Sequence, residues 1–194
     1  MRDIPIIFSA PMVRALLDGR KTQTRRLATS PLAKVQPSDR LWVRENFQLL
    51  SWGDYEVTRY QPCDVRYAAT DTLADADREI RGYPWRPSIH MPRWASRVTL
   101  VVEQVRIMPL KSISEEDAKA EGIAPNPTQP GTWMDYPEGS SAAGLAHPRL
   151  SFRSLWESLH GAGSWSSNPL VIAPTFSVHR VNIGALLMET ARVG

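Results

Sequence analysis

The sequence predicts an α+β fold built around a small mixed or antiparallel β-barrel, and three observations lead to this prediction. Short strand patterns are separated by capped helical patterns, without the regular βαβ alternation of a doubly wound sheet. The 194 residues are 42% hydrophobic and 22% charged, which is typical of a globular domain and excludes a chain disordered throughout. No period of roughly 20 to 50 residues repeats, which argues against a solenoid or a propeller. The length predicts one domain over residues 1–194, with insertions.

The first part of the chain predicts a strand, a helix and a second strand. Residues 4–8 read as a strand, and the helix after them has Ser9 as N-cap and Pro11 in its first turn. Gly19 is expected to end this helix, because glycine adopts the backbone conformation that stops a helix at no steric cost. Residues 41–45 (LWVRE) alternate apolar and polar side chains, as a half-buried strand does.

The second part of the chain predicts a long strand, two helices and a closing strand. Residues 97–110 form the clearest β-rich run, with a bend or bulge where its alternation slips. Ser114 then opens the helix SEEDAKAE, which Gly122 stops. Residues 151–160 carry apolar side chains at helical spacing, and residues 168–183 read as the last strand.

Two segments are predicted to be insertions into this pattern. Residues 48–94 carry turn residues, an acidic stretch and an isolated strand candidate at 65–69, whereas residues 124–147 are rich in Pro, Gly and Ser. Neither segment is expected to form a domain by itself.

The charge is segregated along the chain although its balance is small. Lys and Arg number 23 against 20 Asp and Glu, so a net charge of +3 does not by itself indicate a nucleic-acid binder. Two basic groups stand out: Arg20, Lys21, Arg25 and Arg26, and then Arg86, Arg93 and Arg97. This segregation suits a cleft that receives an anion or a polar base, and the alternative is a solvated surface.

Several classes of protein and site are excluded by what the sequence lacks. No run approaches the roughly 18 apolar residues of a membrane helix, and the N-terminus lacks a signal peptide's apolar core, so we expect a cytoplasmic protein. The single cysteine, Cys63, excludes an internal disulfide framework. With His90, His147 and His160 it shows no metal-ligand spacing, so neither a metal nor another cofactor is expected.

The segment GRKTQTRR, residues 19–26, concentrates four cations and two threonine hydroxyls after a helix. It could bind an anion or activate a nucleophile, and the alternative is a basic turn followed by an exposed strand. Lys21 and Thr24 are three residues apart and would face opposite sides of a regular strand. Their cooperation therefore requires a loop or a bulge.

The helix SEEDAKAEGI carries four carboxylates, most of which we expect to face solvent: Glu115, Glu116, Asp117 and Glu121. Glu121 differs because it lies at the helix end, where the helix dipole disfavours a negative charge. A residue in an unfavourable place indicates a functional site.

Residues 85–97 (WRPSIHMPRWASR) mix aromatic and basic side chains. Such a mixture could stack a base and hold phosphates, with Trp85 or Trp94 lining a pocket, and the alternative is a pair of core tryptophans.

Together these motifs resemble ASCH-domain proteins of the PUA-like superfamily, in the long form found in phages and prophages. The matching pieces are FSAPMVRALLDGRKTQTRR, SDRLWVRE, RPSIHMPRWASRVTL with SISEEDAKAEGI, FRSLWESL and the closing strand, about two thirds of the chain. The resemblance implies a small PUA-like β-barrel flanked by helices, with a cleft associated with RNA, modified bases or nucleosides.

A more distant resemblance is to compact bacterial ASCH enzymes that hydrolyse N4-acetylcytidine with a Lys, a Thr and a Glu. It implies Lys21, Thr24 and Glu121 as catalytic residues that converge in one cleft. Thr24 would be the nucleophile, and its proton would go either to Lys21 or to Glu121, with a charged Lys21 steadying the oxyanion in the second case. The sequence leaves both assignments open.

The leading hypothesis is a metal-independent amidohydrolase of an N4-acylated cytidine or a similar modified nucleoside. The residues expected to bind the substrate are Arg25, Arg26, Glu45, Arg93 and Trp94. We expect Glu45 to approach the cations of residues 19–26 and to position them. The alternatives are a module that binds single-stranded RNA or modified DNA, and a ribonuclease. The sequence leaves the oligomeric state open.

Overall fold

The computed structural model describes residues 1–50, 64–136 and 144–186. The chain divides into two compact units. Unit 1 comprises residues 1–17, 38–101 and 178–194, and unit 2 comprises residues 18–37 and 102–177. Nothing in this division decides whether the chain is one domain with insertions at 48–94 and 124–147, and that prediction stays a prediction.

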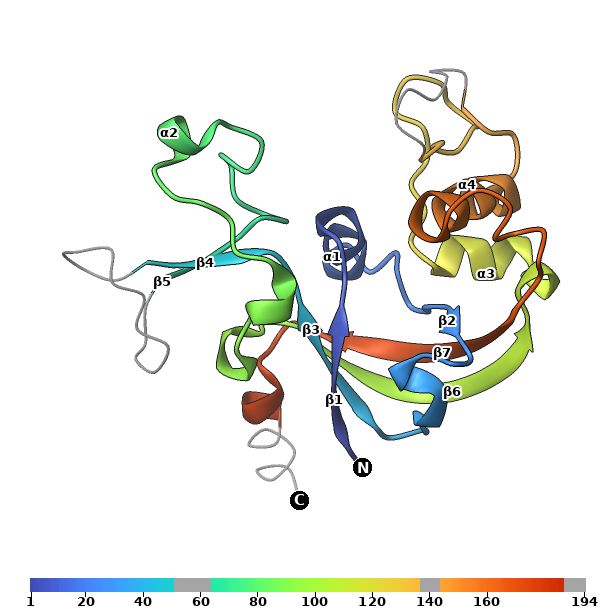
Figure 1. Cartoon of the computed structure of the whole chain (residues 1–194), viewed down its shortest axis with the longest axis horizontal. Helices are drawn as coiled ribbons and strands as arrows, with labels where there is room; N and C mark the ends of the chain where they lie inside the picture. The colour runs from blue at the N-terminus through green and yellow to red at the C-terminus, as the bar shows by residue number, and fades with distance from the viewer. Residues whose placement is uncertain (51–63, 137–143, 187–194) are drawn as a thin grey trace. The chain divides into compact units, whose positions relative to one another are not determined.

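The fold is α+β, as the sequence predicts, with a mixed five-stranded sheet and a separate two-stranded sheet (Figure 1). In spatial order the large sheet consists of β1 (Asp3–Ile7), β3 (Arg40–Arg44), β6 (Thr99–Pro109), β7 (Leu170–His179) and β2 (Arg26–Leu27). β1 pairs with β3 in parallel, whereas β3 with β6 and β2 with β7 are antiparallel.

The described strands form an open sheet and no closed barrel, which corrects the expected barrel. β1 and β2 are the two edges of the sheet. Pro5 lies in the middle of β1 and has no backbone N–H to donate, which suits an edge strand. β2 pairs with β7 through only two residues, so it is too short to extend the sheet further.

Unit 1 contains helix α1 (Ala10–Leu17) and a two-stranded sheet. α1 buries Met12, Val13, Ala15 and Leu16, the stripe that its sequence predicts. β4 (Phe47–Leu50) runs antiparallel to β5 (Asp64–Tyr67), which confirms a strand near the predicted residues 65–69. The short helices of this unit include α2 (Arg78–Arg81), η2 (Ser88–His90) and η3 (Arg93–Ala95).

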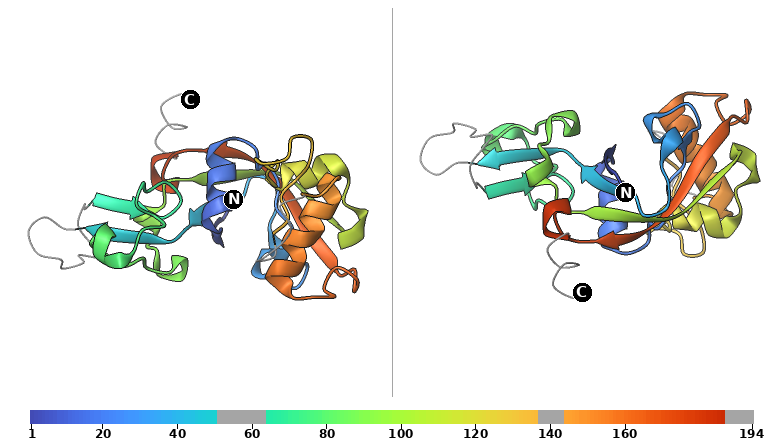
Figure 2. Two further views of the ribbon diagram at one scale, coloured as in Figure 1. Left: turned by 90° about the horizontal axis from the view of Figure 1, so that it is seen from above. Right: turned by 90° about the horizontal axis from the view of Figure 1, so that it is seen from below.

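Unit 2 packs helix α3 (Glu115–Ala120) against helix α4 (Pro148–His160), and Figure 2 shows the two helices side by side. The Ser114 hydroxyl accepts a hydrogen bond of 3.1 Å from the backbone N–H of Asp117, which confirms the predicted cap. Helix α4 begins three residues before the predicted start because a proline suits the first helical turn. The core of this unit comprises Leu110, Ile113, Ala118, Ile123, Phe152, Trp156, Trp165 and Val171, and its 3₁₀ helices are η1 (Pro31–Lys34) and η4 (Leu110–Ser112).

Candidate functional site

The backbone of residues 21–25 passes between the C-terminal end of α3 and strand β7, all within unit 2. Lys21 forms an isolated antiparallel bridge with Glu121, and the N–H group of Gln23 donates to the carbonyl of Ala120 at 3.0 Å. The N–H group of Thr24 donates to a carbonyl of β7 at 3.2 Å. Residue 21 is thereby joined to the end of α3 and residue 24 to the sheet.

This segment is irregular, which agrees with the predicted loop or bulge. Of residues 21–25, Thr22 is exposed, and the other four are buried: Lys21, Gln23, Thr24 and Arg25. A regular strand would alternate buried and exposed side chains, so three consecutive buried residues mark a break in the alternation. Lys21 and Thr24 therefore both point away from solvent despite their spacing of three.

Lys21 and Glu121, two of the three predicted catalytic residues, are in direct contact. The Lys21 Nζ lies 3.2 Å from Oε2 of Glu121 and donates to the main-chain oxygen of the same residue at 2.7 Å. Their side chains are only 3% and 4% exposed. Burial lowers the pKa of Lys21 below its usual 10.5, although the carboxylate of Glu121 acts in the opposite direction.

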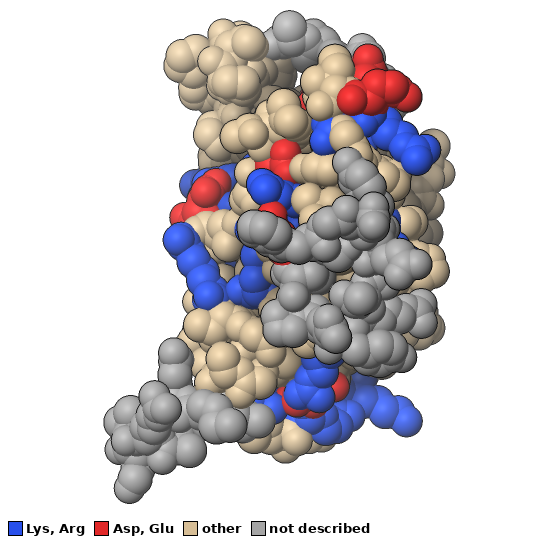
Figure 3. Space-filling model, turned by 90° about the vertical axis from the view of Figure 1, so that its left-hand side faces the viewer, with Lys and Arg blue, Asp and Glu red and all other residues tan. Residues whose placement is uncertain are grey.

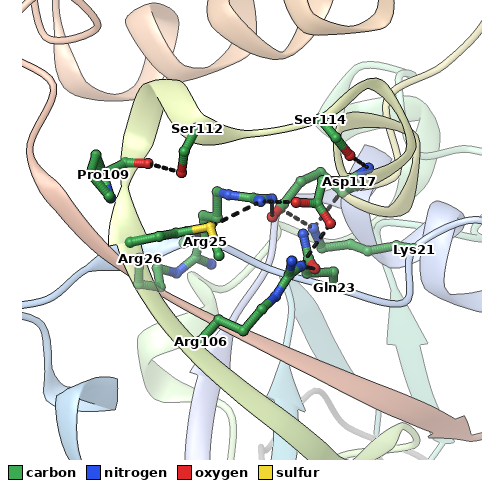
Figure 4. Close-up of polar contacts among 11 residues, drawn as sticks. Lys21, Gln23, Arg25, Arg26, Arg106, Pro109, Ser112, Ser114 and Asp117 are labelled. Atoms are coloured by element: carbon green, nitrogen blue, oxygen red, sulfur yellow. Dashed lines mark hydrogen bonds and ion pairs between the residues drawn. The ribbon is translucent and has the colours of Figure 1, made fainter.

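Arg25 lies at the centre of the same cluster and bridges two carboxylates (Figure 4). Its Nη1 is 2.9 Å from Glu121 and its Nη2 is 2.7 Å from Asp117, and its side chain is completely buried. The guanidinium is thus committed to protein carboxylates. The expected contact of Arg25 with substrate stays a prediction.

Arg106 completes the cluster and was not among the predicted site residues. Its Nη2 donates to Oδ1 of Asp117 at 2.7 Å and to Oε1 of Gln23 at 2.6 Å. Each carboxylate oxygen of Asp117 therefore accepts a hydrogen bond from a different arginine. Most of the Asp117 side chain is buried, whereas the helix pattern predicts a solvent-facing position. Burial would raise the pKa of Asp117, but the hydrogen bonds and charges of Arg106 and Arg25 outweigh it and lower that pKa.

One signal in the sequence could have identified Asp117. Positions 117 and 121 are four residues apart, so they share one face of a helix. The argument that singled out Glu121 could have extended to Asp117 one turn earlier. Gln23 and Arg106 gave no such signal. They bind each other although they lie more than 80 residues apart in the sequence.

Several buried polar atoms of this cluster have no hydrogen-bond partner among the described residues. They are the Gln23 Nε2, the Thr24 Oγ1, the Arg25 Nε and the Arg106 Nε. Buried polar groups in native proteins are nearly always paired, so several unpaired groups in one place indicate a site completed by a ligand or by water. All of these atoms can donate a hydrogen bond.

The cluster also carries more positive than negative charge. Lys21, Arg25 and Arg106 supply three cations, against the two carboxylates of Asp117 and Glu121. A surplus cation in a buried place suits an anion or an oxygen atom on which negative charge develops during a reaction.

Arg26 is the remaining predicted site residue of unit 2. It is half-buried and lies in β2, opposite Ile172 of β7. Burial lowers the pKa of its guanidinium, and the charge of Glu121 acts in the opposite direction. The proposed contact of Arg26 with substrate stays a prediction.

The other predicted site residues belong to unit 1. Both oxygens of Glu45 are bound by Arg97, at 2.9 and 3.0 Å, and burial raises the pKa of Glu45 against the effect of that arginine. Arg93 pairs with Asp3, and Trp94 is 39% exposed. The carboxylate of Glu45 is thus held within its own unit, and its approach to the basic segment stays a prediction.

Trp85, the other candidate for a pocket wall, packs within unit 1. Its indole N–H donates to the carbonyl of Ala74 at 3.2 Å, and the guanidinium of Arg81 lies 4.9 Å from its ring centre. Its ring is therefore engaged in a cation–π contact.

Two further observations concern classes of function. Among residues 1–50, 64–136 and 144–186, no group of three or more His, Cys, Asp or Glu side chains is arranged to hold a metal ion, and Cys63 lies outside these residues. No helix in the same part of the chain combines the length and the apolar character needed to span a membrane.

Comparison with known proteins adds no family to this description. No family model, no curated protein and no solved structure matches the chain. The likeness to ASCH-domain proteins therefore depends on the motifs quoted from the sequence.

Proposed function

We propose that this protein is an ASCH-type, PUA-like amidohydrolase that removes the acyl group from N4-acylated cytidine or a similar modified nucleoside, without a metal or cofactor. The observation that carries the proposal is the buried contact between Lys21 and Glu121, on the segment that also buries the unpartnered hydroxyl of Thr24. A hydroxyl nucleophile requires a neighbouring base, and the two candidates are Lys21, three residues before Thr24, and Glu121, which contacts Lys21.

In the proposed reaction the Thr24 Oγ attacks the acyl carbonyl carbon, and its proton passes to the base. The tetrahedral oxyanion is stabilised by the positive charge that the base gains with this proton, together with the arginines of the cluster. The C–N bond then breaks, and the departing N4 amine of cytidine takes the proton. Water hydrolyses the resulting threonine ester, which releases the carboxylate and restores the hydroxyl.

We assign the base to Lys21. Burial lowers the pKa of Lys21, which favours the neutral amine more than in an exposed lysine, although Glu121 opposes this effect. Glu121 would then orient the amine through the 3.2 Å contact. Lys21→Arg tests this assignment because arginine keeps the charge but cannot act as a base. Loss of turnover supports Lys21 as base, and substantial turnover transfers the role to Glu121.

The decisive experiment compares two threonines of the same segment. Thr24→Ala should lower kcat for N4-acetylcytidine by about a thousandfold or more, with nucleoside binding nearly unchanged, because only the bond-forming atom is lost. Thr22→Ala is the matched control, since Thr22 is exposed and its variant should keep the parent's rate. The proposal fails if the parent hydrolyses no acylated nucleoside, or if Thr24→Ala is as fast as the parent.

A nucleic-acid-binding module is the second candidate, favoured by the exposed surface of Arg93 and Trp94. Among the described residues on the face drawn in Figure 3, however, Lys and Arg side chains lie beside Asp and Glu side chains. A binder should show an affinity for short RNA that falls steeply with salt and falls again in Arg93→Ala. Incubation of the same RNA with the protein also tests the ribonuclease alternative.

A further inference from the structure

Gln23 is a buried side chain of this cluster, and it has no role in the proposed reaction. It is 1% exposed, and its Oε1 accepts a hydrogen bond of 2.6 Å from Arg106. Arg106 is fixed in turn by Asp117, at 2.7 Å from the same nitrogen. The amide of Gln23 is therefore held by a charged network of unit 2 and not by solvent.

The contact with Arg106 determines which way the amide of Gln23 is turned. A guanidinium only donates hydrogen bonds, so the amide must present its oxygen to Arg106 and direct its NH₂ group elsewhere. The Nε2 of that NH₂ group is buried and has no hydrogen-bond partner among the described residues. Leaving such a donor unsatisfied is unfavourable, and a ligand that supplies an acceptor would remove the penalty.

The neighbouring unpaired atoms indicate the chemistry of this ligand. The Nε atoms of Arg25 and Arg106 are donors only, so the cluster lacks acceptors and not donors. A ligand that fits it must present oxygen or unprotonated nitrogen atoms. Apart from its scissile amide, the base of an N4-acylated cytidine presents such atoms at the 2-carbonyl oxygen and at N3.

We infer that the Gln23 Nε2 donates a hydrogen bond to the 2-carbonyl oxygen of the pyrimidine base, so that Gln23 determines specificity for that base. The inference rests on the proposed function, because it takes the substrate from it. The 2-carbonyl oxygen is the stronger ring acceptor and is separated from the amide that Thr24 attacks. Gln23 would recognise the ring while its neighbour in sequence performs the chemistry.

The test measures binding, so that it does not depend on turnover. Dissociation constants of cytidine and 2-thiocytidine are measured by calorimetry for the parent, Gln23→Glu and Gln23→Met. Sulfur accepts hydrogen bonds weakly, so the parent should prefer cytidine by about tenfold. Gln23→Glu keeps an oxygen for Arg106 but lacks the donor, and its preference should fall to about one. Gln129→Met, at an exposed glutamine of the same unit, should keep the parent's preference.

The outcomes separate the inference from the proposed function. Gln23→Met provides the answer if Gln23→Glu does not fold, and melting temperatures identify the folded variants. An unchanged preference in a folded Gln23 variant overturns the inference, and the proposed function stands if the parent still hydrolyses N4-acetylcytidine. If the parent neither binds nor hydrolyses these nucleosides, both fail.

Discussion

Replacing Arg25 by methionine should destabilise the protein strongly. The substitution removes a fully buried cation from Asp117 and Glu121 and keeps a flexible side chain of similar length. Removing one partner of a buried ion pair costs about 3 to 5 kcal/mol, because the other charge stays buried without compensation. Here Lys21 still accompanies Glu121 and Arg106 still accompanies Asp117, so we expect the lower end, about 3 kcal/mol.

For a chain of this length, a loss of about 3 kcal/mol lowers the melting temperature by about 6 to 12 °C. Calorimetric melting and urea unfolding of the parent and the variant measure this loss. Arg153→Met is the matched control, because Arg153 forms an exposed pair with Glu157 four residues later on α4. That pair contributes about 0.3 to 0.5 kcal/mol, so the control should melt within about 2 °C of the parent.

Arg25→Lys separates charge from geometry. Lysine restores the positive charge, but a single ammonium lacks the two separated nitrogens that reach Asp117 and Glu121 together. We expect it to recover only part of the lost stability. The reasoning is refuted if Arg25→Met lowers the melting temperature no more than Arg153→Met does.

Three further predictions concern pH. The pKa of Lys21 is lower in the folded protein than its usual 10.5, so between these two pKa values the unfolded chain binds the proton more tightly. In this pH range the free energy of unfolding, measured with urea, should rise with pH. Lys21→Met should lack this rise. Glu45 has a raised pKa in the folded state, so the parent should lose stability as pH rises from 4.5 through that pKa, whereas Glu45→Gln should not. Burial and the hydrogen bond to Asp71 raise the pKa of Tyr83 to about 12. Ultraviolet titration should therefore show a phenol that titrates late and is lost in Tyr83→Phe.

The helices and long strands could be predicted because their signals are local. The apolar stripe of α1, the cap at Ser114 and the β-rich run of β6 depend only on neighbouring residues, and the structure confirms each within a few residues. Closure of the sheet is different, because it depends on which strands pair across the whole chain. Two-residue β2 carries no recognisable period, and the expected barrel proved to be an open sheet.

The candidate site could be predicted only where a motif pointed to it. The resemblance paired Lys21 with Glu121, one hundred residues apart in sequence, and the structure joins them. Arg106 belongs to none of the quoted motifs, and Asp117 and Gln23 lie inside motifs that assigned them no role. Their contacts arise when α3 and β6 pack around the basic segment. An isolated sequence does not reveal such contacts, because charged residues on an amphipathic helix or strand read as solvent-facing.

The energetics of the cluster support a functional reason for its charges. Burying several charged side chains requires desolvation that their mutual attraction barely offsets, and apolar residues of similar volume would stabilise the fold as well or better. The cluster also holds several unpaired donors, which a purely structural network would avoid. Loss of Arg25 is expected to destabilise because each carboxylate then keeps only one cation, whereas the network as a whole is a poor means of stabilising a domain. The proposed function would account for both features, because a substrate bound at Lys21 and Thr24 would supply the missing acceptors.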